Sequence, residues 1–248
     1  MTTENRPRYL FVLCPPYSGS TLLWKLLATS PNVSALPSEG QFLPELELIM
    51  RDRPWRDELS LPWPHIKSVW LSYWDTSKPI LLEKSPPHLI RARQIANHFQ
   101  PVSFIVMARN PYALCEGLIR RNQWTAREAA EHALRCLLAQ QENLQQFPDS
   151  LKITYESLTR NPVAESQRII GFLPELESLD SQASFKIHSI DGTLDRPIVD
   201  LNPRKIAALS VEQIVDINSV LGQGQEALES WGYKLMPAKD APDQLQRE

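Results

Sequence analysis

The chain has few cysteines and no long hydrophobic run, and both features limit the class of protein to which it can belong. Only three of its 248 residues are cysteine, at Cys14, Cys115 and Cys136, and no two of them form a CxxC pair. A disulfide framework and a zinc or other metal site are therefore not expected, and the reducing environment of the cytoplasm is the predicted compartment. No stretch reaches the ~18 apolar residues of a membrane span. The apolar run over 9–13 is too short for a signal peptide and is followed by two prolines.

The chain also lacks an excess of positive charge. Its net charge of -3 argues against a dedicated nucleic-acid binder, although a local basic patch can still bind an anion. The hydrophobic share of 42% and the charged share of 22% are ordinary for a globular protein that buries a core. We expect one domain over 1–236 and a polar tail over 237–248. The oligomeric state cannot be read from these features.

An irregular segment rich in proline and tryptophan interrupts the domain at about 31–79. Its tryptophans at 55, 63, 70 and 74 are open to two interpretations. They either pack over one end of the fold or line a pocket for a second substrate, because aromatic side chains commonly line such pockets.

Short apolar runs alternate with helical patterns along the rest of the chain. The predicted strands are the runs over 9–13, 80–83, 103–108 and 151–154. The predicted helices cover about 22–30, 88–99, 112–122, 125–147, 161–172 and 210–231. Capping patterns at Thr125, Asn161 and Ser210 support three of these helix starts. The alternation predicts an α/β fold, a single three-layer domain with a central parallel sheet flanked by helices. Ligands of such folds bind at the carboxyl ends of the strands.

The turn after the first predicted strand has the composition of a phosphate-binding loop. It reads PYSGST, in which Ser18, Ser20 and Thr21 offer hydroxyl donors and Gly19 lets the backbone approach an anion. Backbone N–H groups and the positive end of the following helix favour a phosphate there, so the domain is predicted to be of the P-loop type. A nucleoside triphosphate loop would read GxxxxGK[ST], but Ser20 holds its lysine position and Cys14 its first glycine position. A kinase is therefore disfavoured.

A second cluster of possible anion ligands follows the strongest predicted strand. Arg109 comes directly after the run over 103–108, and Arg120 and Arg121 lie one helix later. Arginine offers a phosphate both charge and bidentate geometry. A surface salt bridge at the strand end is the alternative. Two anion sites at different strand ends indicate a ligand with phosphates at both ends.

Five short motifs, in order, resemble those of the sulfotransferase family. PYSGST resembles its 5′-phosphosulfate loop, and RNP at 109–111 resembles its 3′-phosphate motif. YE at 155–156, with NP at 161–162, resembles the segment whose tyrosine contacts adenine. HSIDG from 188 resembles a late HS-x-x-G segment, and WGY at 231–233 resembles the closing motif. Each motif is weak alone, and their common order makes the resemblance.

The resemblance implies transfer of a sulfuryl group from 3′-phosphoadenosine 5′-phosphosulfate (PAPS) to an acceptor hydroxyl, without a metal. The product nucleotide is 3′-phosphoadenosine 5′-phosphate (PAP). The residues that it implies for nucleotide binding are Tyr17, Ser18, Gly19, Ser20, Thr21, Arg109, Gly117, Arg121, Tyr155, Arg196 and Lys205.

The protein-tyrosine branch of the family is the most similar in motif pattern. By this resemblance Glu39 is the general base, and Lys84, before Ser-Pro, stabilises the transferring group. The resemblance also implies that Ser189 or Thr193 supplies a late hydroxyl. We expect Tyr17, which replaces a cation of the family, to donate a hydrogen bond to the leaving phosphate. The acceptor itself cannot be read from the sequence.

Two positions depart from the family pattern. Tyr17 stands where the family has lysine or arginine, and Gly117 stands where it has a serine eight residues after the arginine. These departures keep a non-catalytic nucleotide-binding member of the fold open as an alternative, with a P-loop kinase as a weaker one.

Overall fold

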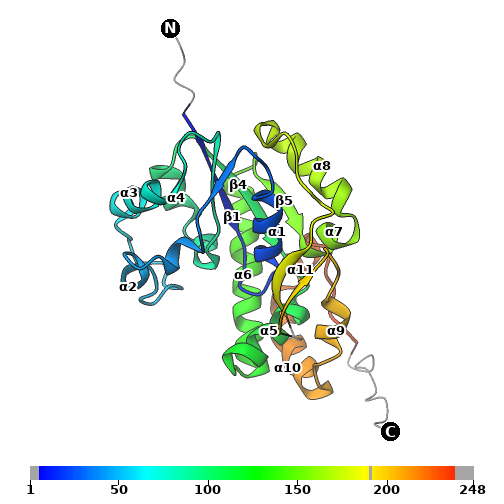
Figure 1. The fold of residues 1–248 in the computed structure, drawn as a ribbon. Helices are drawn as coiled ribbons and strands as arrows, with labels where there is room; N and C mark the ends of the chain where they lie inside the picture. Colours follow the sequence, from blue (N-terminus) through cyan, green and yellow to red (C-terminus); the bar gives the residue numbers. More distant parts are fainter. Residues whose placement is uncertain (1–5, 190–191, 238–248) are drawn as a thin grey trace.

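The computed structural model describes residues 6–189 and 192–237, and a five-stranded sheet lies at its centre (Figure 1). The strands are β1 (Arg8–Leu13), β2 (Val33–Ala35), β3 (Ile80–Glu83), β4 (Val102–Ala108) and β5 (Leu151–Thr154). Their order is β2-β3-β1-β4-β5, and every pair is parallel. The predicted central parallel sheet is confirmed. β2 was not predicted, because its three half-buried residues carry no hydrophobic pattern.

Helices connect the strands and cover both faces of the sheet. The α-helices are α1 (Ser20–Leu27), α2 (Glu47–Met50), α3 (Trp63–Tyr73), α4 (Ala92–His98), α5 (Pro111–Asn122), α6 (Ala126–Gln146), α7 (Tyr155–Arg160), α8 (Pro162–Phe172), α9 (Asn202–Ile206), α10 (Val211–Leu221) and α11 (Gln225–Ser230). Short 3₁₀ turns are η1 (Gly40–Phe42), η2 (Pro86–Ile90), η3 (Pro174–Leu176) and η4 (Gly222–Gly224). A two-stranded antiparallel hairpin, β6 (Phe185–Ser189) with β7 (Gly192–Arg196), stands apart from the main sheet and was not predicted.

Local sequence signals explain where most of the helices begin and where one prediction was wrong. Thr125 and Ser210 form capping boxes at the starts of α6 and α10, as predicted. The last helix was predicted to run to position 231, but α10 ends at Leu221. The 3₁₀ turn that follows contains Gly222 and Gly224, and glycine weakens a helix interior by about 1 kcal/mol relative to alanine. The apolar periodicity crosses this break and resumes in α11.

Alternating side chains of the strands build two cores, one on each face. Tyr9, Phe11 and Leu13 of β1 pack against α3, α4 and α6, whereas Leu10 and Val12 pack against α1, α7 and α8. Figure 1 shows α3 and α4 on one side of the sheet and α1, α7 and α8 on the other. This arrangement is a three-layer α/β domain.

The irregular segment turned out to be mainly packing. Trp63, Trp70 and Trp74 are buried in the core, and the Trp70 ring lies 5.5 Å from that of Phe99. The packing interpretation therefore holds for these three tryptophans. Among the described residues, no helix combines the length and apolar character needed to cross a membrane. All three cysteines are free and buried.

Candidate functional site

A cavity of about 470 Å³ collects the residues that follow all five strands of the sheet. Its lining includes 16–17 and 19–22 after β1, 39 and 41–42 after β2, 84 and 86–87 after β3, Arg109 after β4 and Tyr155 after β5. The predicted site residues among the lining are Tyr17, Gly19, Ser20, Thr21, Glu39, Lys84, Arg109, Arg121, Tyr155, Arg196 and Lys205. The carboxyl edge of the parallel sheet thus brings together side chains that are far apart in the sequence.

The predicted phosphate loop lies at the start of α1. Gly19 precedes the helix with a φ of 84°, in the left-handed region that favours glycine, and a Cβ there would overlap the ring of Tyr155. Ser20 and Thr21 line the cavity. Ser18 does not: its hydroxyl is buried and donates to the carbonyl of Pro15 at 2.7 Å. Ser18 therefore shapes the loop, and the hydroxyls that a ligand can meet are those of Ser20 and Thr21.

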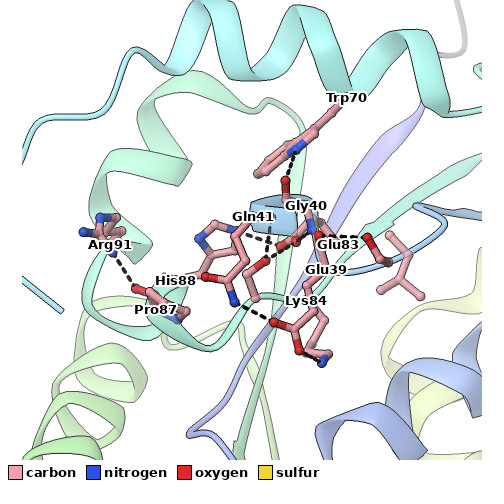
Figure 2. Close-up of polar contacts among 12 residues, drawn as sticks. Glu39, Gly40, Gln41, Trp70, Glu83, Lys84, Pro87, His88 and Arg91 are labelled. Carbon is pink, nitrogen blue, oxygen red and sulfur yellow. Dashed lines mark hydrogen bonds and ion pairs between the residues drawn. The ribbon is translucent and has the colours of Figure 1, made fainter. Parts of the chain in front are cut away.

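Two of the predicted catalytic residues, Glu39 and Lys84, are in direct contact. The Lys84 ammonium pairs with Glu39 and also lies 3.4 Å from the Thr21 hydroxyl. Gln41 donates to the second Glu39 oxygen at 2.6 Å (Figure 2). The Lys84 side chain is 4% exposed and that of Glu39 21% exposed, so the pair is only partly open to solvent. Lys84 thus joins the carboxylate to the phosphate loop.

A buried carboxylate fixes the segments that carry this pair. Glu83, beside Lys84, accepts the backbone N–H of Gly40 at 2.7 Å and the hydroxyl of Ser85 at 2.6 Å. Its second oxygen lies 2.7 Å from His88 Nε2 (Figure 2). Burial raises the pKa of Glu83, but the charge of His88 and these hydrogen bonds outweigh it and leave the pKa lowered. Glu83 therefore links Gly40, which follows Glu39, to the end of β3, which precedes Lys84.

Arg109 is a buried cation whose guanidinium is only partly hydrogen-bonded. Its Nε donates to Asn202 at 2.7 Å, its Nη1 donates to the carbonyl of Tyr17 at 3.0 Å, and its guanidinium lies 3.8 Å from the Tyr155 ring centre. Its Nη2 has no hydrogen-bond partner among the described residues. Burial lowers the pKa of Arg109. A buried guanidinium that lines a cavity and has an unpaired N–H group is suited to an anionic ligand.

Glu156 organises the partners of Arg109. It accepts the amide of Asn202 at 2.5 Å, the backbone N–H of Asn110 at 2.8 Å and the hydroxyl of Tyr233 at 2.9 Å. Asn202 can therefore turn only its oxygen toward Arg109. Glu156 and Asn202 were not predicted as site residues, although Glu156 belongs to the YE motif.

A buried ion pair places a second cation at the cavity. Lys205 contacts Glu116 of α5, which also pairs with Arg120 one turn later. Burial lowers the pKa of Lys205 to about 8, although Glu116 raises it. Arg121, the next residue of α5, lines the cavity and is exposed. Glu116 was missed by the sequence analysis, and its i,i+4 spacing to Arg120 was the available signal.

The remaining predicted residues differ in where they lie relative to the cavity. The Tyr17 hydroxyl donates to Asn122 at 2.7 Å rather than being open to a ligand. Gly117 lies in α5 directly against Tyr17. Thr193 is an exposed residue of β7 and does not line the cavity, whereas Arg196 at the end of that strand does. The side chain of Ser189 lies outside the described part of the structure.

Apolar side chains also line the cavity. Phe42, Pro54, Trp55, Pro86 and Pro87 give it apolar walls. Trp55 is thus the tryptophan of the irregular segment that lines this cavity. The lining of the cavity therefore combines the polar groups of the loop, Arg109 and the Glu39–Lys84 pair with apolar side chains.

Comparison with known proteins agrees with this architecture. The model of a family described as "Sulfotransferase family" matches residues 7–178. No curated protein matches the chain in sequence.

Three solved structures share the fold. The sulfotransferase domain from the curacin biosynthetic pathway superposes with a TM-score of 0.56 at 18% identity, covering 93% of this chain and 99% of its own. The sulfotransferase domain of the Synechococcus PCC 7002 olefin synthase gives 0.56 at 20% identity, covering 95% and 98%. A sulfotransferase from Alicyclobacillus acidocaldarius gives 0.50 at 16% identity, covering 91% and 98%.

Proposed function

The chain belongs to the sulfotransferase family, and we propose that it transfers a sulfuryl group from PAPS to an acceptor hydroxyl. The observation that carries this proposal is one cavity lined by a candidate phosphate loop, a buried arginine with an unpaired donor, and a glutamate–lysine pair. The loop suits the 5′-phosphosulfate and Arg109 suits the 3′-phosphate. Among the described residues, no cluster of potential metal ligands is present, and the proposed transfer uses none.

The contacts of Lys84 support a role at the reacting centre. An ammonium has three N–H donors, and Lys84 directs them toward Glu39 and Thr21 with capacity left for a ligand oxygen. In the proposed reaction the acceptor oxygen forms a bond to sulfur while the bond from sulfur to the 5′-phosphate oxygen breaks. Lys84 stabilises the negative charge that grows on the sulfuryl and leaving oxygens.

Glu39 is proposed to take the proton from the acceptor hydroxyl. A positioned general base contributes about 10²–10⁴-fold to a rate. Its contacts with Lys84 and Gln41 fix the position of the carboxylate at the cavity. A carboxylate base beside a lysine is also the pattern of the protein-tyrosine branch, and we propose a mechanism of that type. The apolar walls at Phe42 and Trp55 favour an acceptor with an apolar body at its hydroxyl.

A non-catalytic nucleotide-binding role is the second candidate, and the observation in its favour is Tyr17. It replaces the expected cation of the loop, and its hydroxyl is already engaged by Asn122. Slow release of sulfate from PAPS by the protein in the absence of an acceptor, abolished in Lys84→Met, would favour the enzyme over this alternative.

The first test is binding of PAP by calorimetry to the wild-type protein and to Arg109→Ala. We expect the substitution to weaken binding by about 10–100-fold, because hydrogen bonds to charged groups contribute roughly 1.5–3 kcal/mol. Arg127→Ala removes an exposed arginine that pairs with Glu131 on α6 and should leave affinity unchanged. Preference for ATP with Mg²⁺ over PAP, or equal affinity of the two arginine variants, would contradict the proposed nucleotide site.

The affinity for PAP should also fall as the pH rises above about 8. Lys205 has its pKa lowered to about 8, so the free protein loses this cation in that range. A bound phosphate favours the protonated lysine, and phosphate itself is already dianionic above its second pKa of about 6. Binding should therefore be flat near pH 7 and weaken several-fold, about 3–10-fold, by pH 9.5. The affinity of Lys205→Arg for PAP should stay constant over the same pH range. An equal fall in affinity in that variant would exclude Lys205 as the cause.

A further inference from the structure

The two departures from the family pattern lie in contact with each other. A Cβ built on Gly117 would stand 2.8 Å from both Cβ and Cγ of Tyr17 and 3.3 Å from its Cδ1. Contacts of 2.8 Å between carbon atoms are far inside van der Waals separation. Gly117 sits inside helix α5, where glycine is unfavourable, so its presence there is explained by the tyrosine above it. A serine at 117 and a tyrosine at 17 exclude one another in this backbone arrangement.

Tyr17 is held by three separate contacts in a backbone conformation that is costly for it. Its φ is 59°, in the left-handed region that non-glycine residues rarely adopt. Its side chain rests on Gly117, its hydroxyl donates to Asn122 at 2.7 Å, and its carbonyl accepts from Arg109 Nη1 at 3.0 Å. Two of these contacts are with α5, and the third is with the buried arginine. The strain is consistent with a positioning role.

The carbonyl of Tyr17 helps to fix the plane of the Arg109 guanidinium. Asn202 binds Nε and Tyr17 binds Nη1, so these two contacts direct the remaining Nη2, which lacks a partner among the described residues. We infer that Tyr17 and Gly117 form one positioning unit, which sets Arg109 to recognise a 3′-phosphate and ties it to the loop for the 5′-phosphosulfate. This inference rests on the proposed nucleotide site. Tyr17 acts through its backbone and its packing, not as a substitute cation.

The test compares Gly117→Ala in two backgrounds, the wild type and Tyr17→Gly. In the wild type the new Cβ displaces Tyr17, and we expect PAP affinity to fall about tenfold or more, in keeping with the loss of one charged hydrogen bond. Tyr17→Gly removes all three carbon atoms that the Cβ would meet, so there Gly117→Ala should change affinity less than threefold. Equal losses in both backgrounds would overturn the inference.

The ratio of the affinities for PAP and for adenosine 5′-phosphate separates a positioning role of Tyr17 from a general loss of structure. Adenosine 5′-phosphate lacks the 3′-phosphate, so its affinity does not depend on Arg109 in the same way. Gly117→Ala should weaken PAP binding more than adenosine 5′-phosphate binding, which lowers the preference for PAP. An unchanged preference would mean that the Tyr17 carbonyl does not set Arg109.

Thermal unfolding keeps the packing claim testable without any ligand. Alanine normally stabilises a helix interior relative to glycine. Gly117→Ala should therefore lower Tm in the wild type, by about 2–4 °C per kcal/mol lost, and raise it in Tyr17→Gly. Gly171→Ala, in α8 with nothing within 4 Å of the new Cβ, is the matched control and should not lower Tm.

If wild-type protein fails to bind PAP while this Tm pattern holds, the nucleotide proposal fails and the packing of the pair stands. If PAP binds and the pattern is absent, the inference alone fails.

Discussion

Replacing Lys84 with methionine is expected to lower kcat for sulfuryl transfer by about 10²–10³-fold, the loss seen when one preorganised donor to a transition-state oxygen is removed. Methionine keeps a long unbranched stem in the buried site of this side chain, so the substitution mainly removes the ammonium. Glu39 keeps the hydrogen bond from Gln41 and stays in place. The expected change is therefore in the reaction rate.

The measurement is steady-state transfer from PAPS, with PAP binding followed in parallel. PAP has no sulfuryl group, so its affinity should stay within about threefold of wild type. Lys78→Met replaces a half-buried lysine that donates to the carbonyl of Pro31 and does not line the cavity; it is the control and should keep full activity. A kcat for Lys84→Met within about twofold of wild type would remove Lys84 from the proposed mechanism.

Removing the Glu83 carboxylate should destabilise the whole domain. Glu83→Ala leaves His88 buried without its partner and strips Gly40 and Ser85 of their acceptor. Breaking a buried ion pair from one side costs about 3–5 kcal/mol of unfolding free energy. Denaturant unfolding measures this loss. Glu131→Ala removes an exposed carboxylate on α6 and should change stability by less than about 0.5 kcal/mol.

The Glu83 carboxylate also makes the free energy of unfolding depend on pH. The folded pKa of Glu83 is lowered, so its contribution is fully present above the unfolded pKa of about 4.3. It is lost as the pH falls through the lower folded pKa. The stability difference between wild type and Glu83→Ala should therefore be constant near pH 6 and shrink below about pH 4. A difference that stays constant down to pH 3 would show that the ionised carboxylate is not what stabilises the site.

The sequence predicted the sheet well because each core strand is a compact apolar run. β3 and β5 have the predicted bounds, and the capping boxes at Thr125 and Ser210 predicted two helix starts. It missed the break after Leu221, because apolar periodicity continues across η4 into α11 and a pattern does not show where a helix gives way. The three-residue strand β2 is fixed by pairing with β3, which no local signal encodes.

The residues of the candidate site could be predicted where a motif is contiguous in the sequence. Hydrogen-bond partners that are distant in the sequence could not. PYSGST and Arg109 stood out in the sequence, but Arg109 is oriented by Asn202, 93 positions away. The glutamate that ends the apolar strand β3 was visible as Glu83, yet its role depends on Gly40 and His88. Gly117 was read as a missing hydroxyl, whereas the structure shows a requirement for space above it.

The Glu156 carboxylate also bears on how the protein is made. Its three partners, Asn110, Asn202 and Tyr233, are translated at very different times. At about 5–20 residues per second, Tyr233 emerges several seconds after Glu156. Until then the carboxylate lacks one of its three hydrogen bonds. The hydrogen bonds around Glu156 are therefore completed only after position 233 has been translated, later than every strand of the main sheet.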